Sequence, residues 1–184
     1  MADSDDIAEV VEFWFGPGMK ERWFECDPAF DAEVRARLGA PHERAAGGEL
    51  GAWRDSAEGC LALIVLLDQA PRNLFRGQAR AFATDAAARE LTGHALAQGF
   101  EAALTQDQRG FLYLPLEHSE TLDDQEASVR LTAALDEDPA WHDYAVRHRD
   151  IIARFGRFPH RNAALGRRST PEEEAFLEQP NSSF

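Results

Sequence analysis

The 184-residue sequence is poor in cysteine and in long apolar runs, and each shortage excludes a class of protein. Cys26 and Cys60 stand 34 positions apart without a C-x-x-C motif, which argues against a zinc site or a redox motif. The longest aliphatic run, Leu61 to Leu67, has seven residues, whereas a membrane-spanning helix needs about 20. We therefore predict two free, reduced thiols, no metal and no membrane segment.

Basic residues are also scarce, with 19 Lys and Arg against 33 Asp and Glu and a formal net charge of −14. A nucleic-acid-binding protein needs a basic face, so this balance disfavours nucleic acid as a partner. The acidic start, Met1 to Asp6, lacks the basic region of a signal peptide, and we expect a cytoplasmic protein with no membrane partner. The length and a hydrophobic content of 44% predict a single domain over residues 1–184.

Apolar residues recur at helical spacing along most of the chain, and no segment alternates with period two. Helix starts are marked by Asp-Pro pairs or capping boxes, at Asp27, Thr105, Asp138 and Thr170. Helix ends are expected at three glycines, Gly39, Gly99 and Gly156, with a separate weak helix from Pro41 to Ala46. The pattern predicts an all-α fold of about eight helices packed as antiparallel pairs.

Arginine is unevenly distributed along this acidic chain. Residues 72–80 contain three Arg and no acid, and residues 147–168 contain seven Arg against Asp150 alone. These two segments together carry +9 within a protein of −14. Because the guanidinium fork suits carboxylate and phosphate, the clustering points to an anion site. The alternative is that these arginines pair with carboxylates of neighbouring helices.

Four further places combine ionisable and apolar residues. The loop from Arg157 to Asn162 is composed like a ligand-binding loop, or alternatively like a buried connection that satisfies free carbonyls at helix ends. The run Glu117-His118-Ser119-Glu120 suits a general base at His118, or simply a capped helix end. His148 shares an apolar helix face and is predicted to be buried and hydrogen-bonded, while Asp68 and Arg72 are candidates for a buried pair.

Three ordered motifs, at residues 67–77, 111–120 and 154–162, together resemble the bacterial family catalogued as domain of unknown function 924. The likeness covers nearly the whole chain. It implies a tetratricopeptide-like α/α superhelix and brings no established activity. Because the three clusters chosen on physical grounds coincide with the family's motifs, we expect Arg72, His118 and Arg161 to lie around one cavity.

Two functions remain open at this point. The first is a pocket for an anionic small molecule, a carboxylate or phosphate, with a catalytic role left open and the cofactor unknown. Its predicted ligand-binding residues are Arg72, Asn73, Arg76, Glu120, Arg157, Arg161 and Asn162, and its predicted proton-transferring residues are His118 and His160. The second is a tetratricopeptide-like scaffold that binds an acidic peptide or partner in a groove. Burial of Arg72 and Arg161 favours the pocket, and their exposure favours the groove.

Overall fold

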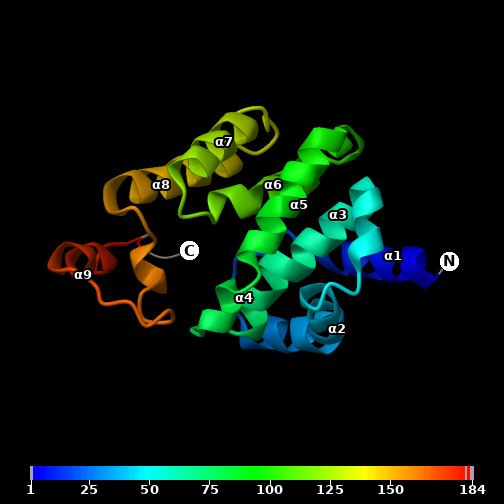
Figure 1. Cartoon of the computed structure of the whole chain (residues 1–184), viewed down its shortest axis with the longest axis horizontal. Coiled ribbons are helices and arrows are strands. Elements are labelled where there is room, and N and C mark those ends of the chain that lie inside the picture. Colours follow the sequence, from blue (N-terminus) through cyan, green and yellow to red (C-terminus); the bar gives the residue numbers. More distant parts are fainter. Residues whose placement is uncertain (1, 181, 183–184) are drawn as a thin grey trace. The chain divides into compact units, whose positions relative to one another are not determined.

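The computed structural model describes residues 2–180 and 182, and every regular element within them is helical (Figure 1). The α-helices are α1 (Ala2–Phe15), α2 (Pro28–Ala46), α3 (Ala57–Ile64), α4 (Ala70–Leu74), α5 (Asp85–Gln98), α6 (Gln106–Glu117), α7 (Leu122–Thr132), α8 (Ala140–Phe155) and α9 (Pro171–Leu177). Shorter helical segments are η1 (Gly51–Asp55), η2 (Val65–Gln69), η3 (Ala79–Phe82), η4 (Phe100–Ala103) and η5 (Pro159–Arg161). The predicted all-α class is confirmed.

The helix α3 continues through η2 into α4 as one buried rod. The segment η2 is a single stretch of π-helix, and every residue from Gly59 to Pro71 is buried. Counted as one rod, this segment brings the described helices to the predicted number of about eight. The tetratricopeptide-like superhelix that the resemblance implies stays a prediction.

Several helix boundaries follow the local signals in the sequence. The side chain of Asp27 accepts hydrogen bonds from the backbone of Ala29 and Phe30 at the start of α2. Thr170 forms a complete capping box at the start of α9. The glycines after α5 and α8 adopt left-handed conformations, with φ of 70° at Gly99 and 68° at Gly156.

The predicted break in α2 at Gly39 is wrong. The helix runs without interruption through Gly39 and Pro41 to Ala46. Its buried face, formed by Phe30, Val34, Leu38, His42 and Ala45, continues past the glycine at helical spacing. His42 Nδ1 lies 2.8 Å from the carbonyl oxygen of Leu66, so the segment expected as a separate helix is held against η2. Tertiary packing therefore outweighs the weak local preference of glycine and proline to end a helix.

Contacts divide the chain into two compact units. Unit 1 contains Met1–Arg76 and Arg80–Pro115, and unit 2 contains Gly77–Ala79 and Leu116–Phe184. In unit 1, α2 packs against α4, and both α1 and α5 pack against α3. In unit 2, α7 packs along α8 (Figure 1). That residues 1–184 fold as a single domain stays a prediction.

Each unit has its own apolar core. In unit 1 the rings of Trp14, Phe30 and Phe111 meet, with centroids 5.9 Å apart for the first two and 6.1 Å for Trp14 and Phe111. In unit 2 the core consists of Ile151, Ile152 and Phe158, and Phe155 and Phe176 pack against it. Burial of these side chains is the main favourable contribution to folding in each unit.

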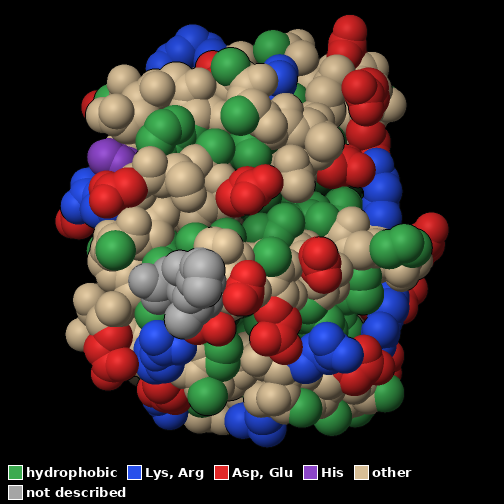
Figure 2. Space-filling view, turned by 90° about the vertical axis from the view of Figure 1, so that its right-hand side faces the viewer, with side chains coloured by type: hydrophobic (Ala, Val, Ile, Leu, Met, Phe, Trp, Pro, Cys, Tyr) green, Lys and Arg blue, Asp and Glu red, His purple; other side chains and the backbone are tan. Residues whose placement is uncertain are grey.

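The surface drawn in Figure 2 mixes acidic and basic side chains, with hydrophobic ones between them. No helix in the described part of the chain is long and apolar enough to cross a membrane.

Candidate functional site

Arg72, on α4 in unit 1, is bound by two carboxylates. Its Nη1 and Nη2 donate to Asp85 at 3.1 and 3.2 Å, and Nη1 lies 3.3 Å from the fully buried carboxylate of Asp68. Burial opposes the charge of Arg72, but Asp68 and Asp85 outweigh it and raise the pKa of the guanidinium above its ordinary value. The guanidinium fork of Arg72 is thus directed at the protein's own acids.

Asn73 and Arg76 both bind Asp31 on α2. Asn73 Nδ2 donates at 2.8 Å, and Arg76 donates through Nε and Nη2 at 2.6 and 2.8 Å. Burial tends to raise the pKa of the Asp31 carboxyl, but these donors outweigh it and hold the pKa below its usual range. Three of the predicted ligand-binding residues therefore form polar pairs between helices of unit 1, as the alternative from the sequence describes.

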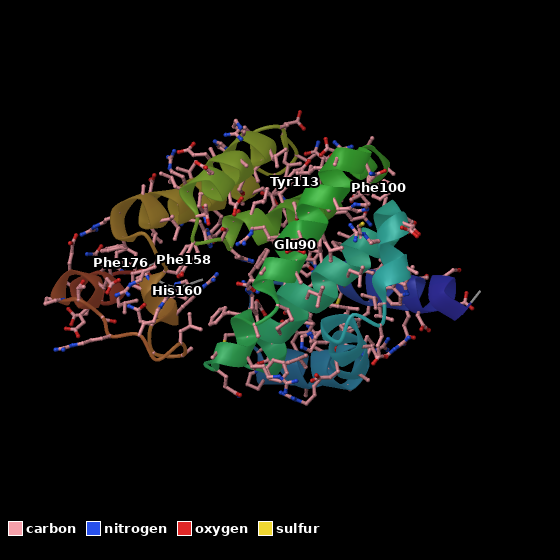
Figure 3. All side chains as sticks on the ribbon, viewed as in Figure 1. Glu90, Phe100, Tyr113, Phe158, His160 and Phe176 are labelled. Atoms are coloured by element: carbon pink, nitrogen blue, oxygen red, sulfur yellow. The ribbon has the colours of Figure 1, made fainter. Side chains whose placement is uncertain are left out.

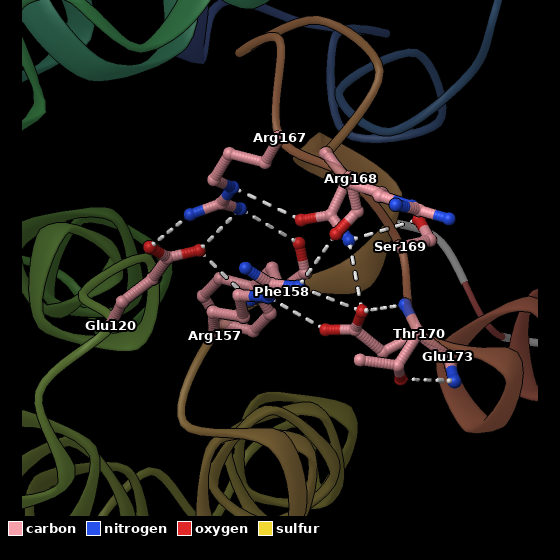
Figure 4. A network of polar contacts seen from close by, with 9 residues as sticks. Glu120, Arg157, Phe158, Arg167, Arg168, Ser169, Thr170 and Glu173 are labelled. Carbon is pink, nitrogen blue, oxygen red and sulfur yellow. Dashed lines mark hydrogen bonds and ion pairs between the residues drawn. The ribbon is translucent and has the colours of Figure 1, made fainter.

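In unit 2, Glu120 binds Phe158 and Arg167, which both lie far from it in the sequence (Figure 4). Arg167 donates to both of its carboxylate oxygens, at 2.7 and 2.9 Å, and the backbone N–H of Phe158 donates to Oε1 at 2.8 Å. Burial alone would raise the pKa of Glu120, but the bonds from Arg167 and Phe158 hold it below its ordinary value. Glu120 thereby positions the start of the predicted ligand loop.

Arg157 and Asn162 bind Glu173 at the start of α9 (Figure 4). Arg157 donates to the two oxygens of Glu173 at 2.6 and 2.8 Å, and Asn162 Nδ2 lies 3.3 Å from Oε2. The Arg157 bonds and the backbone N–H of Thr170 lower the pKa of Glu173 to about 2. These contacts fix the loop between η5 and α9.

Cationic and titratable side chains contact the fully buried Phe158, which follows α8 and is labelled in Figure 3 near His160. The guanidinium carbon of Arg161 lies 4.5 Å from the ring centroid, and the rings of His148 and His160 lie 5.6 and 5.5 Å away. His118 joins the group through His148, at 6.1 Å between centroids. We call these five residues the Phe158 cluster.

Burial differs among the members of the cluster. Arg161 is only 6% exposed and His148 is also buried, whereas His118 and His160 are half-buried. The prediction that His148 is buried and hydrogen-bonded is confirmed, since its Nδ1 lies 2.9 Å from the carbonyl oxygen of Tyr144. The half-buried imidazoles can reach solvent while the guanidinium is held inside.

Among the described residues, the predicted site residues form no metal site, and they do not line the open pocket of unit 1. Within residues 2–180 and 182, no group of three or more His, Cys, Asp or Glu side chains is arranged to hold a metal ion. An open pocket of about 340 Å³ lies in unit 1 beside the start of α6, and Lys20, Trp23 and Asp107 are among the residues that line it.

The comparisons with known proteins agree with the fold. Residues 10–181 match the bacterial protein family of unknown function DUF924. The chain belongs to this family. It is similar to ATU0120, a protein of unknown function from Agrobacterium tumefaciens, whose solved structure has 43% sequence identity and a TM-score of 0.90. The match covers 95% of this chain and 98% of that one. No protein of curated function matches the chain.

The structure distributes the predicted site residues of this DUF924 protein over both units. Arg72, Asn73 and Arg76 lie in unit 1, and the other predicted residues lie in unit 2, so the convergence of Arg72 with His118 and Arg161 stays a prediction. The ligand-binding and proton-transferring roles of all nine residues likewise stay predictions.

The partners of the site residues in unit 2 could not be predicted from the sequence. There, Arg167 is one residue of a basic segment and Glu173 is part of a capping box. Glu117 stands beside His118 in the sequence, but its pairing with His148, 3.0 Å away, joins residues that are 31 positions apart. Two features of the sequence hint at the pair of Glu117 and His148. Glu117 stands at the end of an apolar helix, and His148 lies on the apolar face of another helix.

Proposed function

We propose that the protein binds a small anion, a carboxylate or a phosphate, at the Phe158 cluster. The observation that carries the proposal is the contact of Arg161, His148 and His160 with one buried aromatic ring, with His118 beside His148. Donors that carry charge bind anions through short, strong hydrogen bonds. Their attraction is larger in a site that excludes water, because the effective dielectric constant is lower there.

Two acids of this unit, Glu120 and Glu173, are each bound by another arginine. Arg167 binds Glu120 with two hydrogen bonds, and Arg157 binds Glu173 in the same way. We infer that Arg157 and Arg167 shape the loop and that Arg161, His118 and His160 contact the ligand.

Burial supports a pocket more than an open groove. The scaffold alternative requires basic side chains on an exposed face, but Arg161 is 6% exposed and the side chain of Arg72 is 21% exposed. An acidic peptide is therefore an outcome of the test below, not a second proposal. The exposed Cys26 is a free thiol, which is typical of proteins in a reducing compartment such as the cytoplasm.

The experiment is an anion screen by thermal unfolding of the full chain at constant ionic strength. Phosphate or a small dicarboxylate should raise the melting temperature relative to chloride, because a ligand that binds only the folded state stabilises it in proportion to RT ln(1 + [L]/Kd). Arg161→Lys should reduce this increase, since lysine keeps the charge but loses the planar fork.

The matched control is Arg154→Lys, because Arg154 precedes the same loop but pairs at the surface with Glu172. This variant should keep the full response to the anion. An absence of any anion-specific shift in the wild-type protein would refute the proposal, and stabilisation by an acidic peptide alone would favour the scaffold.

A further inference from the structure

The open pocket of unit 1 has the size of a site for a small molecule. Its volume of about 340 Å³ lies at the lower end of the range for ligand pockets, which is roughly 300–1,000 Å³. The end of α1, the turn after it and the start of α6 form its walls, and all of its lining residues belong to unit 1. None of them is a member of the Phe158 cluster, so this pocket is independent of the proposed function.

Two aromatic rings form part of the pocket wall. Phe15 and Trp23 both line the pocket, with ring centroids 5.7 Å apart and an angle of 69° between the ring planes. Trp23 is held in place, because its Nε1 donates to the carbonyl oxygen of Trp14 at 2.7 Å and its ring packs edge-to-face with the fully buried Phe111. Two rings at a steep angle form two sides of a corner, and aromatic cages surround an ammonium group with such walls.

The charged residues that line the pocket leave an excess of negative charge. They are Lys20, Glu21 and Asp107, one cation against two acids. Lys20 donates to both carboxylate oxygens of Asp107, at 2.9 and 3.1 Å, so these two charges compensate each other. Glu21 is exposed and belongs to no ion pair within residues 2–180 and 182. The remaining charge at the pocket is therefore negative.

The start of α6 adds little attraction for an anion. A helix N-terminus carries a partial positive charge and N–H groups without partners in the helix. Here the side chains and backbone N–H groups of Thr105 and Gln108 bind each other, at 3.0 and 3.3 Å. Asp107 places a carboxylate in the first turn of the helix. Much of the positive character of this helix end is therefore compensated within the protein itself.

We propose that this pocket binds a small organic ammonium, with Phe15 and Trp23 against its alkyl groups and Glu21 as its counter-ion. The face of an aromatic ring attracts a cation, and tryptophan does so most strongly. The alkyl groups on the nitrogen bury apolar surface against the same rings. A metal ion would need a group of ligands instead, and within residues 2–180 and 182 no three His, Cys, Asp or Glu side chains are arranged to hold one.

The test is a titration of the full chain with choline chloride, followed by backbone-amide NMR, against sodium chloride at the same concentrations. Choline is the probe because it carries a quaternary ammonium on a small, flexible chain. We expect shifts of the amide signals of Gly16 and Gly18, which both line the pocket. The tert-butyl analogue of choline has carbon in place of nitrogen, and thus the same shape without the charge. It should bind at least about fivefold more weakly.

Two variants change the charge of the pocket in opposite directions. Glu21→Gln removes the negative charge and should weaken choline binding about two- to fivefold. Lys20→Met leaves Asp107 without its cation and should strengthen choline binding by a similar factor. Glu25→Gln is the matched control, because Glu25 is another exposed acid nearby in the sequence that does not line the pocket. This variant should bind choline as the wild type does.

Three results would overturn the inference. Binding of the uncharged analogue as tightly as choline would mean that the pocket is only an apolar site. An unchanged affinity in Glu21→Gln would remove the counter-ion, and the absence of choline-specific shifts at the pocket would remove the site. If a variant fails to fold, the wild-type comparison of choline with its analogue decides the question. The anion screen plays no part in these measurements, so the two proposals can fail separately.

Discussion

The two arginine-rich segments differ in what their side chains contact. In unit 1, the three arginines of segment 72–80 pair with carboxylates of neighbouring helices, at Asp85, Asp31 and Glu43. In unit 2, Arg157 and Arg167 do the same, but Arg161 lies over an aromatic ring surrounded by histidines. In this acidic protein, the clustered arginines mainly form ion pairs that connect neighbouring helices and loops. The histidines and the buried ring of Phe158 distinguish the surroundings of Arg161, the candidate binding site, from these ion pairs.

The largest expected effect is on unit 1. Arg72→Met leaves the fully buried carboxylate of Asp68 without its cation, and should lower the free energy of unfolding by about 3–5 kcal/mol in urea titrations. Asp68 accepts a further hydrogen bond from Gln69, which does not replace the lost charge. A loss below about 1 kcal/mol would break the comparison, because Arg72 would then be available for a ligand.

The next effect concerns the acid stability of unit 2. The pKa of Glu173 is about 2 in the folded protein against 4.5 for the free side chain. The stabilisation by ionised Glu173 is therefore complete above about pH 4.5 and is lost as the pH falls towards 2. Glu173→Gln should cost about 1–3 kcal/mol at neutral pH and reduce the slope of unfolding free energy against pH in this window. Urea unfolding at several pH values measures both, with the exposed Glu172→Gln as control. An unchanged slope would show that Glu173 is not held ionised by Arg157.

A smaller effect separates the two kinds of arginine within unit 2. Arg161→Lys should weaken phosphate binding about tenfold, which reduces the stabilisation by saturating phosphate by about 1.4 kcal/mol. Arg157→Lys should lower stability without phosphate, because it loses one of two bonds to Glu173, but keep the phosphate increment. Thermal unfolding with and without phosphate measures both quantities. Loss of the increment in Arg157→Lys would restore Arg157 as a ligand-binding residue.

The smallest effect is at an exposed ion pair of unit 1. Lys20 donates to Asp107 at 2.9 and 3.1 Å, and their side chains are 52% and 33% exposed. Lys20→Met should change the unfolding free energy by less than about 1 kcal/mol, because solvent screens exposed pairs. Urea unfolding beside Arg72→Met provides the contrast. A cost as large as that of Arg72→Met would mean that burial does not set the strength of these pairs.

Local features of the fold could be predicted from the sequence. The caps at Asp27 and Thr170 and the glycine after α8 act over a few residues, so their side chains and backbone groups meet whenever the helix forms. The inward position of His148 follows from helical periodicity in the same way. The continuation of α2 through Gly39 and Pro41 could not be predicted, because it depends on packing against a segment elsewhere in the chain.

The sequence by itself determined the helical class, the capped helix starts at Asp27 and Thr170, and the presence of two arginine-rich segments in an acidic chain. Only the tertiary structure decided which acid each arginine meets, for example Arg167 with Glu120 at 47 positions' separation, and that Glu117 reaches His148. The physical reason is the distance along the chain over which each interaction acts. Capping and periodicity are set by neighbours along the chain, whereas the pairing and burial of charges depend on which helix faces are brought together when the apolar core forms.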